Sequence, residues 1–462
     1  MSSSSAHVVV VGGGIAGLAA AHALGRADPA PEVTVLEASP VIGGKLRLAE
    51  VGGVTVDVGA EAMLNRRPEA VGLAREAGLG DDLVHPATTT AQLWNRGRLV
   101  PMPRTLMGVP TDLSSLEQVI SRKGIARAAM DAVLPATELD GRDVSVGDLV
   151  EERFGREVVD RLVEPLLGGV YAGHAREISA RAATPQVVAL LERDRSLARA
   201  AASVLAGPAS EVPVFAGIRG GVGRLPHAVA EASGALVRVD ATVRDLVRRP
   251  GRGWRLVVGS TRDPQLVEAD AVVLATPARA TARLLSDVAP DAALELARIE
   301  YASMAIVTMA FSERDLPQVP GSGFLVPPVD GRTIKAATFS FAKWDWVREA
   351  GNGLLVLRCS IGRHREEQAL QVPDEALVAA AVADLADAIG LSVRPVDAHV
   401  QRWGGALPQY SVGHAGRVAS VRLALQALPG LAVCGAAYDG LGIPACIASA
   451  RLAAEKVLAD LA

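Results

Sequence analysis

The hydrophobic pattern opens on a strand, a glycine turn and a helix. Residues 8–11 are an unbroken run of valines, which is typical of a strand buried on both faces. Glycines 12–14 interrupt this run, and the Ala- and Leu-rich segment 15–24 predicts a helix that packs closely on a sheet. A second strand is predicted at 33–36 and ends before Glu37. These elements together predict one βαβ unit.

The pattern then becomes mostly helical over residues 112–206. Segments such as 145–153 and 157–167 carry helical periodicity and are separated by Gly and Pro, which interrupt helices. We expect a helical insertion here.

Strand patterns return after the helical stretch, and the later half of the chain is rich in them. Strands are predicted at 236–239, 254–258, 271–274, 305–311, 334–341, 354–361, 398–403 and 431–434. Those between 299 and 403 alternate well enough for an antiparallel sheet, with one helix at 374–389. A closing helix is predicted at 446–461.

The order of these elements predicts an α/β protein whose Rossmann-like nucleotide-binding domain is discontinuous. We expect that domain to comprise 1–80, 210–298 and 404–462, assembled from three separated segments. An antiparallel-sheet substrate domain is predicted from 81–111 and 299–403, and a helical domain from 112–209.

Composition limits the classes of function. The chain has 462 residues, half of them hydrophobic and 21% charged, which indicates a globular protein of two or three domains rather than a disordered one. With 47 basic and 51 acidic side chains the net charge is −4, so there is no electrostatic footprint for nucleic acid.

Cysteine usage and the first apolar run bear on location. Three cysteines without metal-ligand spacing indicate neither a disulfide framework nor a metal site, and favour a reducing cytoplasm. The apolar run 8–25 contains several glycines, and the leader before it lacks a basic segment. We therefore expect no export signal and no membrane-spanning helix.

The glycine turn contains the first candidate binding motif. Gly12, Gly14 and Gly17 form GxGxxG between a strand and a helix, and Glu37 follows twenty residues after the last glycine. Gly12 permits the tight turn, Gly14 lets the backbone approach a pyrophosphate, and Gly17 lets helix and strand touch. Glu37 would accept hydrogen bonds from an adenosine ribose. The pattern predicts a dinucleotide but does not choose between NAD and FAD.

Two further motifs make that choice. EASPVIGGKLR supplies a second glycine pair and Lys45, and DVGAEAM follows at 57–63. This series of motifs resembles the superfamily of FAD-containing amine oxidases, phytoene desaturases and protoporphyrinogen oxidases. The resemblance implies the GR2 or amine-oxidase type of fold, with FAD lying extended across the domain. The cofactor residues that motif and resemblance indicate are Gly12, Gly13, Gly14, Ile15, Ala16, Gly17, Glu37, Ala38, Gly44, Lys45, Gly59, Ala60, Glu61, Ala62, Val243, Trp403, Gly442, Ile443 and Pro444.

The later motifs narrow the family. LVEPLLGGVYAG at 162–173, GFLVPP at 323–328, LPQYSVGH at 407–414 and the stretch around 434–447 look like the bacterial porphyrinogen oxidases. The resemblance covers residues 8 to about 458. LPQYSVGH looks like the soluble branch of that family, which acts on coproporphyrinogen III in haem biosynthesis.

The resemblance also implies a reaction and its partners. Three successive two-electron hydride transfers to FAD would convert coproporphyrinogen III to coproporphyrin III, and dioxygen would reoxidise the flavin to give hydrogen peroxide. Flavin N5 would carry the chemistry, so we predict no catalytic side chain. A transient contact with a downstream chelatase is left open.

Three residues are predicted to bind substrate. Coproporphyrinogen carries four propionates, so cations are expected around an apolar floor. Arg67 is the candidate for a propionate, and Val170 and Tyr171 of the GGVYAG motif are candidates for contact with the macrocycle.

Three alternatives stay open at this point. Protoporphyrinogen IX would serve the same chemistry with two propionates. Another oxidase of the superfamily would act on an amine or a carotenoid, although aromatic residues are only 3% of the chain, too few for an aromatic cage. A relative that has lost the flavin and binds a protein or lipid would be colourless when purified.

Overall fold

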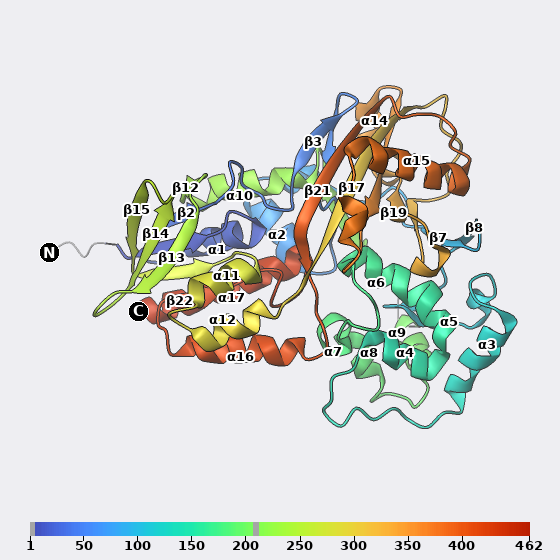
Figure 1. Ribbon diagram of the computed structural model, residues 1–462, viewed down its shortest axis with the longest axis horizontal. Coiled ribbons are helices and arrows are strands. Elements are labelled where there is room, and N and C mark those ends of the chain that lie inside the picture. Colours follow the sequence, from blue (N-terminus) through green and yellow to red (C-terminus); the bar gives the residue numbers. More distant parts are fainter. Residues whose placement is uncertain (1–4, 207–211) are drawn as a thin grey trace.

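The computed structural model describes residues 5–206 and 212–462. Its element order is a nucleotide-binding βαβ unit, a helical stretch, a return to that unit, a large antiparallel sheet and a final return (Figure 1). The C-terminus lies at the end of the molecule formed by the parallel sheet and its helices (Figure 1).

A five-stranded parallel sheet forms the first layer. Its order is β12 (Leu236–Arg238), β2 (Glu32–Leu36), β1 (His7–Val11), β16 (Ala271–Leu274) and β22 (Leu431–Val433). Strands from three distant parts of the chain therefore pair, as in a doubly wound fold. The predicted strands of this sheet are confirmed to within one or two residues.

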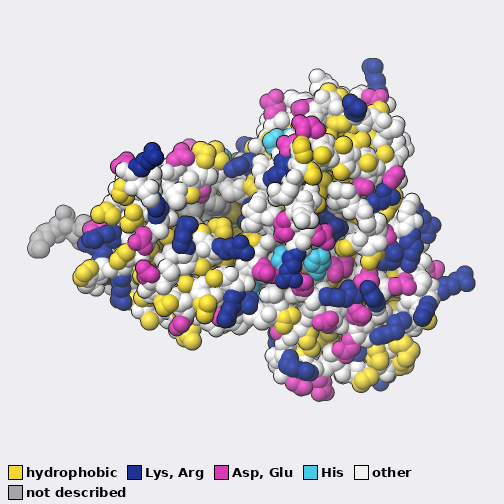
Figure 2. Space-filling view, in the orientation of Figure 1, with side chains coloured by type: hydrophobic (Ala, Val, Ile, Leu, Met, Phe, Trp, Pro, Cys, Tyr) yellow, Lys and Arg dark blue, Asp and Glu magenta, His cyan; other side chains and the backbone are white. Residues whose placement is uncertain are grey.

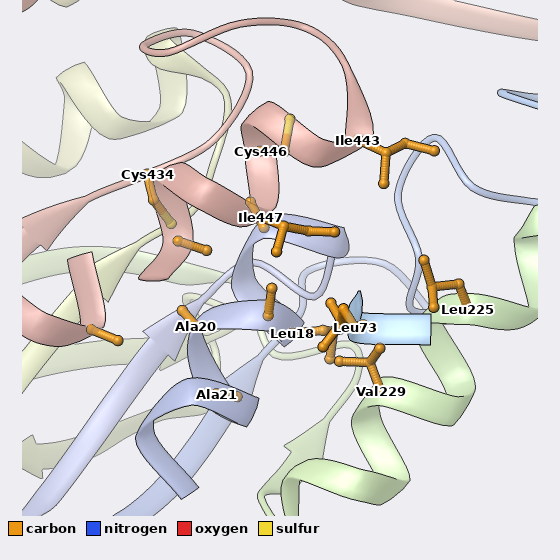
Figure 3. Close-up of a cluster of buried hydrophobic side chains, with 14 of the residues drawn as sticks. Leu18, Ala20, Ala21, Leu73, Leu225, Val229, Cys434, Ile443, Cys446 and Ile447 are labelled. Atoms are coloured by element: carbon orange, nitrogen blue, oxygen red, sulfur yellow. The ribbon is translucent and has the colours of Figure 1, made fainter. Parts of the chain in front are cut away.

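The two faces of this sheet are covered by different elements. Val8 and Val10 pack with the helices α1 (Ile15–Gly25), α2 (Pro68–Glu76), α10 (Leu225–Ser233) and α17 (Ile443–Leu461). Figure 3 shows part of this cluster, in which side chains from all four helices gather.

Val9 and Val11 face the other way. They pack with the antiparallel strands β13 (Val243–Arg248), β14 (Trp254–Gly259) and β15 (Pro264–Ala269), and with the helices α11 (Ala278–Leu285), α12 (Pro290–Ala297) and α16 (His414–Gln426). This alternation explains why the valine run has no polar position.

The second layer is a seven-stranded sheet. Its order is β21 (Asp397–Pro408), β17 (Tyr301–Ser312), β20 (Leu354–Ile361), β19 (Ile334–Thr338), β18 (Gly323–Leu325), β7 (Gln92–Asn95) and β8 (Arg98–Pro101). All pairs are antiparallel except β18 with β7. Helix α15 (Asp374–Ile389) packs on one face, where the sequence predicts it.

One predicted strand is too long. The alternating pattern over 334–341 indicates a strand, but β19 ends at Thr338 and α13 (Ser340–Lys343) follows, then α14 (Asp345–Gly351). The chain turns because Ser340 and Lys343 both reach Glu61, at 3.3 and 2.7 Å. The closing helix also starts earlier than predicted, at Ile443, because Pro444 suits a first helical turn.

The helical part lies beside the large sheet (Figure 1). Its helices are α3 (Arg122–Ala129), α4 (Val146–Phe154), α5 (Arg156–Val158), α6 (Glu164–Tyr171), α7 (Ala180–Ala183), α8 (Pro185–Leu190) and α9 (Leu197–Leu205), with a π-helical turn at Val159–Val163. A buried ion pair of 2.7 Å between Arg153 and Asp131 anchors this part. Asp131 also accepts a hydrogen bond from the Ser196 hydroxyl at 2.6 Å.

Short elements complete the fold. They are the hairpins β3 (Leu48–Val51) with β4 (Val54–Asp57) and β9 (Thr105–Leu106) with β10 (Val109–Pro110), and a small sheet of β5 (Met63–Leu64), β11 (Phe215–Ile218) and β6 (Leu83–Val84).

Two of the predicted domain limits can be compared with the chain as the structure describes it. The limit between 403 and 404 falls inside β21. The limit between 209 and 210 lies outside the described residues. The predicted three-domain division stays a prediction.

Candidate active site

One cavity of about 800 Å³ runs from the parallel sheet to the seven-stranded sheet. At one end its walls are the glycine turn after β1 and the segment after β2. At the other end they are α6 and the strands β18, β19 and β20. The cavity therefore joins a nucleotide-binding turn to a largely apolar chamber.

The glycine turn opens onto this cavity. A Cβ at Gly17 would lie 1.9 Å from the Gly12 carbonyl oxygen, so helix and turn touch only because position 17 is glycine. Gly12 has φ of +109°, a conformation that favours glycine. At Gly14 a Cβ would meet no protein atom within 4 Å and would occupy the cavity instead.

The N-terminus of α1 faces the same space. It has no side-chain cap and no acidic residue in its first turn, and Ile15 and Ala16 line the cavity. The exposed N–H groups and the helix dipole favour an anion there. These features fit a pyrophosphate.

Glu37 closes the adenosine end of the cavity. Its carboxylate accepts hydrogen bonds from the Gly13 N–H at 2.6 Å and from the Ser39 N–H and hydroxyl, each at 2.8 Å. These bonds orient the carboxylate, which lines the cavity beside Ala38 and Val243. Val243 is the first residue of β13 and 5% exposed. A carboxylate held in this way suits ribose hydroxyls.

A second helix N-terminus meets the cavity. Gly442 is the N-cap of α17, which has neither a side-chain cap nor an acidic residue in its first turn. Ile443 and Cys446 of this turn line the cavity, and burial raises the pKa of the Cys446 thiol to about 11. Tyr410 holds the preceding loop, since its hydroxyl donates to the Ala436 carbonyl at 2.6 Å.

The segment after β4 is held in place from the large sheet. Trp403 Nε1 donates to the Val58 carbonyl at 3.0 Å, and Arg358 Nη1 donates to the Gly59 carbonyl at 2.7 Å. Gly59 and Ala60 line the cavity with Trp403. The sheet therefore sets the position of the wall that the sequence assigns to the isoalloxazine.

Glu61 points away from the cavity. Its carboxylate contacts Lys343 Nζ at 2.7 Å and Arg358 Nε at 3.2 Å. Burial disfavours its ionised form, but Arg358 and Lys343 outweigh burial and lower the pKa of Glu61 to about 2. Glu61 thus supports the cavity wall through Arg358 rather than forming it.

Fourteen of the predicted site residues lie in the walls. They are Gly12, Gly14, Ile15, Ala16, Glu37, Ala38, Gly44, Lys45, Gly59, Ala60, Val170, Val243, Trp403 and Ile443. The predicted cofactor residues outside the walls are Gly13, Gly17, Glu61, Ala62, Gly442 and Pro444. Burial lowers the pKa of Lys45.

The structure separates the three predicted substrate residues. Val170 on α6 lines the cavity and is 55% exposed. Tyr171 turns the other way, into the helical core, with its ring centroid 5.7 Å from that of Tyr410. Arg67 lies outside the cavity walls, paired with Glu69 at 2.6 Å. This placement does not favour contact of Tyr171 with the macrocycle. The predicted role of Arg67 in binding a propionate stays a prediction.

Several wall residues were not singled out from the sequence. Thr242 and Arg283 lie at the adenosine end, where a second, open hollow of about 570 Å³ adjoins the cavity. Leu325, Ala336, Thr338, Arg358 and Ser360 lie at the opposite end. Leu325 falls in a motif noted in the sequence, whereas the pairing of β19 with β20 brings Ala336, Thr338, Arg358 and Ser360 together.

Comparison with known proteins decides the family. A protein-family model described as flavin containing amine oxidoreductase matches residues 15–458 of this chain. The chain belongs to this family. A flavin-containing family and a dinucleotide-binding turn together identify the cofactor as FAD and the protein as an oxidoreductase.

Its relatives include several porphyrinogen oxidases. The chain is 39% identical to the coproporphyrinogen III oxidase of Mycobacterium tuberculosis, covering 98% of this chain and 97% of the relative. It is 31% identical to that of Bacillus subtilis, with full coverage of both. A solved structure from Exiguobacterium sp. 255-15, described as a protoporphyrinogen oxidase, matches with a TM-score of 0.86 and 32% identity over 99% of each chain.

The residues present fit FAD. Two helix N-termini without acidic residues, the open space at Gly14 and the oriented Glu37 would hold its pyrophosphate and ribose. Gly59, Ala60 and Trp403 would border its ring system. Within 5–206 and 212–462 no helix is both long and apolar enough to cross a bilayer.

Proposed function

We propose that this protein oxidises coproporphyrinogen III to coproporphyrin III in haem biosynthesis, with dioxygen as acceptor and hydrogen peroxide as product. The observation that carries the proposal is the single cavity that joins the FAD-binding turn to an apolar chamber on the large sheet. The relatives at 39% and 31% identity, named as coproporphyrinogen III oxidases, support this choice of substrate.

The chamber suits a tetrapyrrole. Val170, Leu325, Ala336 and Leu407 are apolar and come from both sides of the cavity. They would hold the macrocycle by apolar contact and exclude water from it. Arg358, in the same walls, is held by Glu61, which keeps this cation in one position.

Chemistry at this site rests on positioning. When bound, FAD supplies the two-electron acceptor for each of three oxidation steps. Tyr301 and Cys446 line the cavity, and burial raises the pKa of Tyr301 to about 12 and that of Cys446 to about 11, so both groups stay protonated near neutral pH and accept no proton there. The chain's contribution would be to orient the ring, because a porphyrinogen releases protons readily as it becomes aromatic.

The test compares two substrates on the purified yellow protein. Porphyrin fluorescence is followed in air with coproporphyrinogen III and with protoporphyrinogen IX, after the flavin spectrum is recorded. We expect a higher kcat/KM for coproporphyrinogen III and three molecules of peroxide for each porphyrin formed. A preference for protoporphyrinogen IX, as the name of the Exiguobacterium structure suggests, would overturn the choice of substrate but not the reaction class.

The three cysteines bear on location. All are free and buried, so none forms a disulfide. This agrees with a reducing compartment, and we propose the cytoplasm. Fractionation of cells, with the flavin spectrum as marker, tests it.

A further inference from the structure

Two buried cations lie at the end of the large sheet nearest to α6. Lys335 on β19 is 2% exposed, and Arg363, two residues after β20, is 6% exposed. Arg363 Nη2 donates to the Val326 carbonyl at 3.2 Å, and the Val326 N–H donates to the Lys335 carbonyl at 2.9 Å. The same short segment of backbone therefore holds both residues.

Their charges are poorly compensated. Among the described residues, Lys335 Nζ has no hydrogen-bond partner, and no carboxylate lies within 4 Å of it. The ion pair of Arg363 is with Glu366 at 4.0 Å, and that carboxylate is half-exposed. A buried cation without a close counter-charge is costly. Such groups are enriched at functional sites.

Both cations are close in the chain to residues that line the substrate end of the cavity, although neither lines it. Ala336, the residue after Lys335, lines the cavity, and so do Leu325, next to Val326, and Ser360, three residues before Arg363. The pairing of β19 with β20 is irregular between Ile334 and Ala336, so Lys335 is the extra residue of a bulge. The bulge therefore interrupts the regular alternation of side chains along β19 at this lysine.

The described carboxylates on neighbouring elements form no ion pair with Lys335 or Arg363, although Glu164 is close enough to favour the charged form of Arg363. Glu164, which begins α6, accepts from the Ala175 N–H at 3.0 Å through one oxygen, while its other oxygen has no partner. Asp384 on α15 accepts from the Ile334 N–H at 2.9 Å and lies 3.5 Å from Arg332. Asp387 also pairs with Arg332.

We propose that Lys335 and Arg363 form a cationic floor beneath the substrate end of the cavity, which selects a macrocycle bearing carboxylates over a less acidic one. This inference rests on the proposed function and deepens it by naming residues for its selectivity. The floor acts through its electric field, which is strong because little water lies between buried charge and cavity. Direct contact with a carboxylate is not required.

The selectivity should depend on pH. Burial, aided by Arg363, lowers the pKa of Lys335 to about 7. The side chain of Lys335 therefore carries its positive charge below pH 7 and loses that charge above pH 7, while Arg363 stays charged. The preference for the more acidic substrate should fall as pH rises from 6 to 8, a range in which exposed lysines and carboxylates do not titrate.

Lys335→Met in the FAD-loaded protein tests the proposal. We expect kcat/KM for coproporphyrinogen III to fall about tenfold, mainly through KM, and that for protoporphyrinogen IX to change less than about threefold. The variant should also lose the pH dependence of the ratio. Lys456→Met, at a paired surface lysine on α17, is the matched control and should change neither. Arg363→Met gives a second variant in case one fails to fold.

Binding separates failure of this inference from failure of the proposed function. Coproporphyrin III and its uncharged tetramethyl ester are titrated by fluorescence quenching into the wild type and Lys335→Met. Weaker binding of the acid alone supports the floor even if the wild type oxidises neither porphyrinogen. Equal losses for acid and ester, or an unchanged substrate ratio in a folded variant, would overturn it.

Discussion

Single residues decide whether the dinucleotide end of the cavity can accept a ligand. At Gly17 the missing side chain allows helix and turn to meet, whereas at Gly14 it leaves room that belongs to the cavity. Substitutions at the two positions should therefore differ. A side chain at Gly17 disrupts packing, but one at Gly14 interferes with FAD.

Gly14→Asp should weaken FAD binding while leaving the fold intact. A Cβ at Gly14 meets no protein atom within 4 Å, and a carboxylate there would repel the pyrophosphate, so we expect affinity to fall about hundredfold, or ~3 kcal/mol. Flavin fluorescence on titration measures it. Gly416→Asp in the first turn of α16, also with no atom within 4 Å, is the control and should bind FAD normally.

Glu61 should make the protein sensitive to acid. Because its folded pKa of about 2 lies below the ordinary 4.5, its stabilising contribution is present above pH 4.5 and is lost as pH falls toward 2. The shift corresponds to about 3 kcal/mol.

Urea unfolding of Glu61→Gln measures this contribution. At pH 7 we expect the variant to be less stable by about 3–5 kcal/mol, since Arg358 and Lys343 lose their buried partner. The gap should narrow below pH 4.5. Glu313→Gln, which breaks a half-exposed pair with Arg348, should cost less than about 1 kcal/mol at every pH.

At the scale of elements, α6 is the cover of the substrate end. It packs on β18 and β19 and presents Val170 to the cavity while burying Tyr171 in the helical core. Successive residues on a helix point in directions about 100° apart, so one motif serves two purposes.

Val170→Trp should block substrate but not cofactor. The larger side chain fills the chamber, so we expect kcat/KM to fall about tenfold or more with an unchanged flavin spectrum. Steady-state oxidation measures it. Val204→Trp on α9, an exposed valine outside the cavity walls, should behave as the wild type. Equal activity of the two variants would place the substrate elsewhere.

At the scale of the whole molecule, FAD would tie the layers together. The cavity walls come from the parallel sheet, the large sheet and α6. Acidic and basic side chains are interspersed over the face in Figure 2, so no single charged surface dominates that view.

FAD should stabilise the folded protein. At free FAD a hundredfold above Kd, the expected gain is about 2.7 kcal/mol, because the ligand binds only the folded chain. Calorimetry of the protein stripped of flavin and titrated with FAD measures the rise in Tm. NAD serves as the control and should leave Tm unchanged. A similar rise with NAD would contradict the assignment of the cofactor.

The sequence by itself determined the dinucleotide turn, since strand, glycines, helix and Glu37 lie within a single βαβ unit and their roles are local. It also determined most strands of both sheets through hydrophobic periodicity. Tertiary structure decided which neighbours face the cavity: Ala60 lines it and Glu61 turns away to meet Arg358. Side-chain direction depends on packing against elements hundreds of residues distant, which no local pattern encodes. For the same reason only strand pairing reveals the bulge at Lys335, next to the cavity-lining Ala336.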